Sequence, residues 1–418
     1  MSYRYRHNPN NNTVLPMTED KFFIGVIVGF LAKCGADFID RIWTKMTKSD
    51  RFCDSSSDSS NNKGCNWNGC ERSHSTDSET SCSSSESLSS NGEVHGNDRE
   101  IVAIQGDKKT PVGEESPLNY DEIKAIADFL LSKTMYRCQI GIICGSGLSE
   151  LGNLLENRTT IHYEDIPHFP VSTVVGHKGQ MVIGLLKNVP VVCMQGRFHP
   201  YEGYPTWKCA LPVRVLHLMG VKSLIISNAA GSLMSDHRVG DIMIIKDHIS
   251  MPGLAGRSPL VGSNDNRFGT RFPSMQGAYN KKYREYALKI GEEIGLKDNI
   301  HEGVYCMNGG PVYETPAECR MLLNTLNINA VGMSTVPEVV VARHCGMLVF
   351  AFSLISNKCV MDTDSENSPN HAEVVAACAS RKSDLKVFVE RMVLQIYNDL
   401  QSLPLENDKS YWKLLLGK

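Results

Sequence analysis

The sequence lacks a basic surplus, a long apolar run and a recognisable secretory signal. Its 418 residues carry a formal net charge of -3, whereas dedicated nucleic-acid binders are usually basic, so we expect no nucleic-acid partner. The first apolar run starts late, at Phe22, and lacks a cleavage pattern. Several of the 14 cysteines lie inside apolar runs, which is typical of buried, reduced thiols. We therefore expect a cytoplasmic protein.

The segment 21–43 is the candidate for membrane contact. Its continuous apolar core spans only residues 22–31, whereas a membrane-spanning helix needs about twenty residues. Lys33 and Asp37 interrupt any extension of the apolar core. We interpret the segment as a short amphipathic or docking helix, and an interfacial membrane anchor is the alternative.

Residues 50–100 contain few apolar side chains and many Ser, Asn, Asp and Glu. Such a segment buries too little apolar surface to offset the entropy of ordering, so we predict that it is disordered. Cys65 and Cys70 form one close pair, but no second pair of Cys or His follows, which favours scattered thiols over a metal site. The predicted organisation is a largely disordered N-terminal extension over 1–116, a folded domain over 117–403 and a tail over 404–418.

From about Pro117 the pattern becomes that of a folded domain. Asn119 followed by Glu122 resembles a capping box at the start of a helix. Short apolar runs, which are typical of buried strands, then alternate with helical patterns, and this predicts an α/β sandwich with a largely buried sheet. The apolar runs lie at 140–144, 189–196, 221–231, 239–249 and 346–357, and the helical patterns include 317–326 and a long one at 374–396.

Several common catalytic signatures are missing from the folded part. The glycine-rich GSGL at 145–148 follows a predicted strand, where backbone amides can meet an anion. However, Ser149 and Glu150 do not complete a P-loop, and Glu150 stands where a dinucleotide fingerprint needs glycine. No Gly-x-Ser-x-Gly elbow is present, which argues against an α/β-hydrolase. No cluster has metal-ligand spacing, so we predict no metal.

What the sequence does contain is a set of polar strand ends. QGRFHPYEGYP at 195–205 places Arg197, His199 and Tyr201 at alternating positions, which point to one face if the chain is extended. A cation, an imidazole and a phenol on one face suit a phosphate beside a sugar, and a solvated edge strand is the alternative. SNAAGS at 227–232, GMSTVPE at 332–338 and LISNK at 354–358 add small and polar residues. Since ligands collect at the carboxyl ends of strands in open α/β sheets, we predict a site for a small, polar, anionic ligand.

Taken in order, the motifs over roughly 117–403 resemble the trimeric class of purine nucleoside phosphorylases. They include ICGSGL, IPHFPVSTVVGHKG, MQGRFHPYEGYP, SNAAGS, GGPVYETPAECR, AVGMSTVPEVVVARHCG, SLISNK and NHAEV. The resemblance implies an α/β fold of phosphorylase type, with a mixed, distorted β-sheet flanked by α-helices. It also implies a homotrimeric enzyme that splits a purine nucleoside with phosphate into free base and ribose 1-phosphate. No cofactor is implied, because inorganic phosphate is a co-substrate.

The same resemblance implies the site residues. Phosphate would be held by Ser146, His177, Arg197, His199, the backbone amide of Ala229 and Ser334. The nucleoside would be held by Tyr201, Tyr313, Glu314, Met333, Asn357 and His371, with Phe272 supplied by the neighbouring subunit. The residues implied to be catalytic are Asn357, Glu314 and His199.

Glu314 and Asn357 bear on base preference. A carboxylate accepts the N1–H of a 6-oxopurine but faces the bare N1 lone pair of a 6-aminopurine, so inosine and guanosine are expected over adenosine. Three residues depart from the family's usual pattern and could widen or re-polarise the base pocket: Tyr313 replaces Phe, Ser356 replaces Thr, and Asn308 replaces a small apolar residue.

Two other functions are alternatives to this one. A methylthioadenosine phosphorylase tends to carry Asp in the base pocket and a small residue where His371 stands. A catalytically silent binding protein would lack phosphate-binding or base-binding residues. The presence of Glu314, Asn357 and the phosphate-binding set argues against both.

Overall fold

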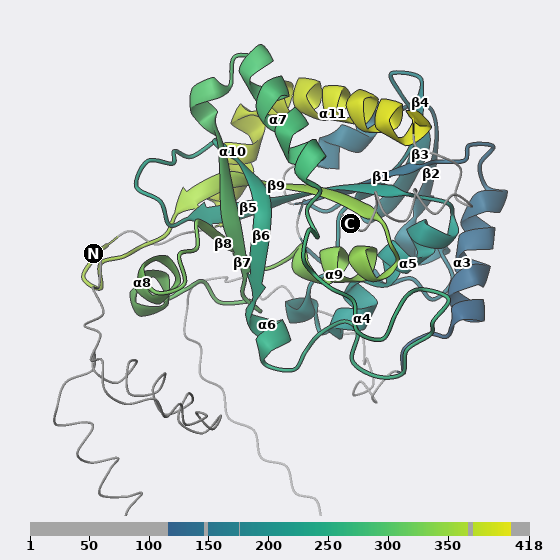
Figure 1. Ribbon diagram of the computed structural model, residues 1–418, viewed down its shortest axis with the longest axis horizontal. Helices are drawn as coiled ribbons and strands as arrows, with labels where there is room; N and C mark the ends of the chain where they lie inside the picture. The colour runs from purple at the N-terminus through teal and green to yellow at the C-terminus, as the bar shows by residue number, and fades with distance from the viewer. Residues whose placement is uncertain (1–115, 146–148, 175, 367–370, 403–418) are drawn as a thin grey trace, which may run out of the picture. The chain divides into compact units, whose positions relative to one another are not determined.

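The computed structural model describes residues 116–145, 149–174, 176–366 and 371–402 (Figure 1). The predicted disordered extension, the segment 21–43, Ser146 and the C-terminal tail lie outside these residues. The first described helix begins at Tyr120 and the last ends at Ser402. The limits assigned to the folded domain from the sequence remain a prediction.

The described residues form one mixed sheet of nine strands in the order β2-β3-β4-β1-β5-β8-β7-β6-β9. An additional pairing joins β5 to β9, so the strands β5, β8, β7, β6 and β9 close into a ring. Parallel and antiparallel pairs occur side by side, for example β1 with β5 and β3 with β4. The strands are β1 (Ile140–Cys144), β2 (Glu156–His162), β3 (Gln180–Leu186), β4 (Val189–Gln195), β5 (Ser223–Ser232), β6 (Ile242–Ser250), β7 (Ile300–Met307), β8 (Ala330–Gly332) and β9 (Leu348–Lys358).

Helices cover the sheet on two sides, which Figure 1 shows as α7, α10 and α11 above the strands and α3, α4, α5 and α9 below. Two apolar clusters fill the space between them. One contains Ile126 of α3 and Val339 of α9, and the other contains Tyr283 of α7 and Phe388 of α11. The helices are α3 (Tyr120–Ser132), α4 (Thr206–Cys209), α5 (Leu211–Leu218), α6 (Met251–Leu254), α7 (Lys281–Glu293), α8 (Pro316–Asn324), α9 (Val336–His344), α10 (His371–Ser380) and α11 (Lys382–Ser402).

The local signals in the sequence correspond to particular contacts. The Asn119 side chain accepts from the backbone N–H of Glu122 at 3.0 Å, and the Glu122 carboxylate accepts from the backbone N–H of Asn119 at 2.7 Å. The predicted capping box at the start of α3 is therefore confirmed. The strand predicted at 140–144 is β1, and all five of its residues are buried.

One sequence-based expectation differs from the structure. The helical pattern at 374–396 is not one helix, because α10 ends at Ser380 and α11 begins at Lys382. Between them, the Arg381 side chain donates to the backbone oxygen of Gly240 at 3.0 Å. The run predicted at 221–231 is confirmed as β5, and SNAAGS forms its C-terminal part, where it pairs with β9 as far as Lys358.

Candidate active site

A pocket of about 510 Å³ opens where several strands end. It receives residues from the loop after β4, the second half of β5, the segment after β8 and the end of β9, so the convergence predicted from the sequence is present. Residues from four sequence-predicted segments line it, including Arg197, Ala229, Ser334 and Asn357.

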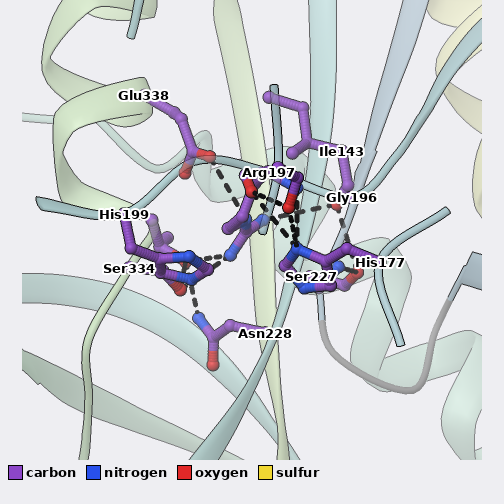
Figure 2. Close-up of polar contacts among 12 residues, drawn as sticks. Ile143, His177, Gly196, Arg197, His199, Ser227, Asn228, Ser334 and Glu338 are labelled. Atoms are coloured by element: carbon purple, nitrogen blue, oxygen red, sulfur yellow. Dashed lines mark hydrogen bonds and ion pairs between the residues drawn. The ribbon is translucent and has the colours of Figure 1, made fainter. Parts of the chain in front are cut away.

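Arg197 is the buried cation of this pocket, with only 1% of its surface exposed. Its Nη1 donates to Ser334 Oγ at 2.8 Å and to Thr335 Oγ1 at 3.1 Å. Its Nε lies 3.2 Å from Glu338 Oε1, which partly neutralises the guanidinium. Figure 2 shows Arg197 between Glu338 on one side and Ser334 on the other. A buried arginine held in this way is a fixed site for an anion.

Thr335 occupies a strained backbone position at the start of α9. Its φ of 76° lies in the left-handed region, which a β-branched residue rarely adopts. Asn228 of β5 donates to its hydroxyl at 2.8 Å, in addition to the bond from Arg197. Residues in such conformations cluster at ligand sites, since surrounding contacts must hold them there.

His199 is oriented by a carboxylate. Its Nδ1 lies 3.0 Å from Glu202 Oε2, which leaves Nε2 for a ligand. Burial alone would raise the pKa of Glu202, but hydrogen bonds from His199 and from Thr173 outweigh it and leave this pKa lowered. The ring of Tyr201 stacks on His199 with 4.6 Å between the ring centroids. The chain is extended at His199 but turns into a short 3₁₀ helix at Pro200, so the three alternating residues reach one pocket without lying on one extended strand.

His177 packs behind His199, with 5.6 Å between the two ring centroids. Its Nδ1 lies 3.1 Å from Ser172 Oγ and 3.2 Å from the backbone oxygen of Arg197. Burial, together with the neighbouring His199 and Arg197, lowers the pKa of His177 to about 4. The imidazole is therefore neutral at physiological pH.

A carboxylate, Glu314, and an amide, Asn357, also line the pocket. Burial raises the pKa of Glu314, and hydrogen bonds from its own backbone N–H and from Asn308 oppose that rise. The Ser356 hydroxyl donates to Asn357 Oδ1 at 3.0 Å. Because that oxygen is engaged, the Nδ2 group of Asn357 is left to donate to a ligand.

Comparison with known proteins places the chain in a family. A family model described as "Phosphorylase superfamily" matches residues 139–393. The chain is 50% identical to a purine nucleoside phosphorylase of Bos taurus over 277 residues, which cover 66% of this chain and 96% of the relative. The chain belongs to the purine nucleoside phosphorylase family of this superfamily. The family, the fold and the enzyme class predicted from the sequence are thereby confirmed.

Other purine nucleoside phosphorylases give the same result. The relative from Anopheles gambiae is 50% identical over 296 residues, which cover 71% of this chain and 84% of the relative. A crystal structure of the Schistosoma mansoni enzyme in complex with inosine matches with a TM-score of 0.64 and 47% identity, covering 69% of this chain and 98% of that one. The same enzyme in complex with adenosine also matches with a TM-score of 0.64, at 47% identity, covering 69% of this chain and 99% of that one.

The phosphorylase pocket brings together most of the residues singled out in the sequence. Those that line it are Arg197, His199, Tyr201, Ala229, Tyr313, Glu314, Met333, Ser334 and Asn357. His177 lies behind His199, and Ser146 is outside the described residues. His371 is the first residue of α10, whose Val374 lines the pocket, but its side chain is not described. Phe272 is 87% exposed and is not among the lining residues.

Residues that shape this phosphorylase pocket but were not singled out in the sequence include Thr173, Glu202, Asn228, Thr335 and Glu338. Glu202 could have been found, because it stands three residues after His199 and within the same motif. Glu338 lies in a quoted motif, but its partner Arg197 is distant in the sequence. Only the fold brings these two charges together.

Proposed function

We propose that this phosphorylase catalyses the reversible phosphorolysis of inosine, guanosine and their deoxy forms, giving the free purine and (deoxy)ribose 1-phosphate. The observation that carries the proposal is the set of polar and charged side chains that line one pocket. A buried arginine with two hydroxyl neighbours lines this pocket together with a carboxylate and an amide. That combination suits phosphate and a purine nucleoside bound in one pocket.

At the phosphate end, Arg197 supplies charge, Ser334 a hydroxyl and the Ala229 backbone amide a neutral donor, while His199 presents its Nε2 to the phosphate. His177, and Ser146 outside the described residues, complete the set proposed from the sequence. Fixing phosphate against the anomeric carbon turns a bimolecular attack into a positioned one. The phosphate anion stabilises positive charge on the ribosyl group as the glycosidic bond breaks, and then captures that group.

At the base end, Asn357 donates toward N7 as the purine gains negative charge. This bond strengthens during the reaction, so it stabilises the transition state more than the ground state. Glu314 accepts N1–H of a 6-oxopurine and thereby favours inosine over adenosine. Tyr201, Met333 and His371 hold the ribose, and Tyr313 covers the base.

We further propose a cytoplasmic homotrimer that acts in purine salvage and nucleoside catabolism, with Phe272 entering the neighbouring subunit's pocket. No cofactor or metal takes part in this proposal, and phosphate is the co-substrate. Among the described residues, no three His, Cys, Asp or Glu side chains lie close enough to hold a metal ion. None of the described helices is long and apolar enough to cross a membrane.

The experiment that tests the proposal is phosphate-dependent release of hypoxanthine from inosine by the full-length chain. Adenosine and methylthioadenosine are assayed in parallel, and phosphate is omitted as a control. Preferred cleavage of inosine that requires phosphate supports the proposal. Preferred cleavage of methylthioadenosine would assign the chain to that related activity, and no cleavage of any nucleoside would indicate a silent binding protein.

A further inference from the structure

The side chain of Asn308 is hydrogen-bonded to the carboxylate of Glu314, the residue proposed to read purine N1. Asn308 directly follows β7, and its Nδ2 donates to Glu314 Oε1. Its own Oδ1 accepts from the backbone N–H of Gly310 at 3.0 Å. A backbone N–H can only donate, so it fixes which end of the Asn308 amide is oxygen and turns the NH₂ group toward Glu314.

The backbone of Asn308 is fixed as well. Its N–H donates to the backbone oxygen of Gly332, the last residue of β8, at 2.9 Å. Gly332 lines the pocket, and so does Glu314, whereas Asn308 does not. Asn308 is therefore placed to act on the base through Glu314 and not by touching the base itself.

Several neighbouring groups affect the pKa of Glu314, and Asn308 is one of them. Burial raises the pKa of Glu314, and the charge of Glu318 on α8 raises it further, whereas hydrogen bonds from its own backbone N–H and, less strongly, from Asn308 lower it. Among the described residues, other titratable groups that interact with Glu314 include the thiols of Cys306 at the end of β7, Cys319 on α8 and Cys359 after β9. The Asn308 NH₂ group is a side-chain donor on this carboxylate.

We propose that Asn308 is a positioning residue that sets the base preference of this phosphorylase by deciding which atom of side chain 314 faces the purine. The inference rests on the proposed function, because it takes Glu314 to meet purine N1. With Asn308 on Oε1, we assign Oε2 as the atom that accepts N1–H. A family member with a small apolar residue at this position has no such donor.

The proposal predicts how an amide at position 314 would be oriented. In Glu314→Gln, Asn308 would still donate to an oxygen, so the Gln carbonyl turns toward Asn308 and the Gln NH₂ group turns toward the base. That NH₂ group meets the N1 lone pair of adenosine favourably and the N1–H of inosine unfavourably. With Asn308→Asp added, the new carboxylate accepts from the Gln NH₂ group, and the Gln carbonyl turns back toward the base. The aspartate also keeps an oxygen for the Gly310 N–H.

The test compares the wild-type chain, Glu314→Gln, Asn308→Asp and the double variant. The ratio of kcat/KM for inosine to that for adenosine should fall at least about tenfold in Glu314→Gln and recover at least about tenfold in the double variant. Equal ratios in Glu314→Gln and in the double variant would overturn the inference. If the double variant does not fold, Asn308→Ala in the Glu314→Gln background replaces it. In that variant the Gln amide at position 314 is free to turn either its oxygen or its NH₂ group toward the base, so the inosine-to-adenosine ratio should recover in part. A ratio unchanged from Glu314→Gln would also overturn the inference.

The single variant Asn308→Asp provides a readout that a structural role would not move. Two carboxylates in contact bind their first proton more tightly than an isolated carboxylate does, because the two negative charges repel each other. The acid limb of kcat/KM for inosine should therefore move to higher pH, with a rise in KM larger than the change in kcat. Val312→Ala is the matched control, because Val312 is on the same loop and 74% exposed. An unshifted acid limb in Asn308→Asp contradicts the role.

Failure of this inference is distinguishable from failure of the proposed function. If the wild-type chain does not split inosine with phosphate, the proposed function itself is wrong. If the wild-type chain does so and the ratios or the acid limb fail as described, only the role of Asn308 is wrong.

Discussion

Arg197 and Glu338 form an ion pair inside the protein, with Nε 3.2 Å from Oε1 and both side chains almost fully buried. The second carboxylate oxygen of Glu338 has no hydrogen-bond partner among the described residues. Burial raises the pKa of Glu338, and the charge of Arg197 opposes that rise. The pair therefore places a cation in the pocket at a high desolvation cost, which an incoming anion can help to offset.

Glu338→Gln should destabilise the chain and make it more dependent on phosphate. Removing one partner of a buried pair typically costs about 3–5 kcal/mol, because the other charge stays buried without compensation. Phosphate would then supply the missing negative charge. We expect a lower Tm without phosphate and a larger phosphate-induced rise in Tm than in the wild-type chain. Glu285→Gln, at an exposed position on α7, is the control, and an equal phosphate-induced rise in all three proteins would argue against the pairing.

Asn357→Ala should lower kcat for inosine at least about tenfold while changing the KM for phosphate less. A donor that strengthens as charge develops is worth roughly 3–4 kcal/mol at the transition state. Steady-state kinetics in each substrate separate the two parameters. Asn324→Ala, at the exposed end of α8, serves as the control. Small and equal losses in both parameters would show that Asn357 does not meet N7.

Ser356 should affect the rate of inosine cleavage by orienting the Asn357 side chain. Its hydroxyl holds Asn357 Oδ1 and so keeps the Nδ2 group turned to the ligand. Ser356→Ala should lower kcat for inosine several-fold, whereas Ser356→Thr keeps the hydroxyl and should retain activity. The Ser356 hydroxyl also lies 3.3 Å from the Ala230 backbone oxygen, which is an alternative acceptor for it. Equal activity of the alanine and threonine variants would mean that the hydroxyl serves that oxygen instead.

Local patterns in the sequence predicted the parts of the fold that depend on near neighbours. The capping box at Asn119 and the buried strand at 140–144 need only a few adjacent residues to be recognised. The division between α10 and α11 was not predictable, because both helices have an apolar face and the contact of Arg381 with Gly240 joins residues 141 positions apart. The closure of β5 onto β9 is non-local in the same way.

In the site, too, the sequence predicted only the contacts between residues that are close together in the chain. Arg197, His199 and Tyr201 were found because they lie in one short motif. The contact of Arg197 with Ser334 joins residues 137 positions apart, so no local rule connects them. The resemblance to a family supplied that connection, and it also flagged Asn308 as unusual. It did not reveal that Asn308 donates to Glu314, since that contact depends on how the loop after β7 folds back.

The buried imidazole of His177 should make the chain less stable in acid. Its pKa is about 4 in the folded chain, against roughly 6.5 when unfolded. Between those values the unfolded chain binds a proton that the folded chain does not, so this stability is fully present above about pH 6.5 and is lost as the pH falls toward 4. His217, whose pKa burial also lowers to about 4, provides a comparison outside the pocket.

His177→Gln and His217→Gln should each make the free energy of unfolding less dependent on pH in this range. Denaturant titrations at several pH values measure that dependence. Only His177→Gln should also raise the KM for phosphate, because His217 lies outside the pocket. A rise in that KM in both variants, or in neither, would conflict with the position assigned to His177.

Phe272 should serve a subunit other than its own. An aromatic side chain that is 87% exposed contributes little to the packing of its own chain, so Phe272→Ala should raise the nucleoside KM without lowering the Tm of the folded chain. The sharper test mixes subunits. Arg197→Ala chains lack a working phosphate site but carry Phe272, whereas Phe272→Ala chains have the reverse defect. Subunits exchanged between the two should give more activity, at low inosine, than the sum of the separate proteins. Activity equal to that sum would place Phe272 with its own chain's pocket or outside any pocket.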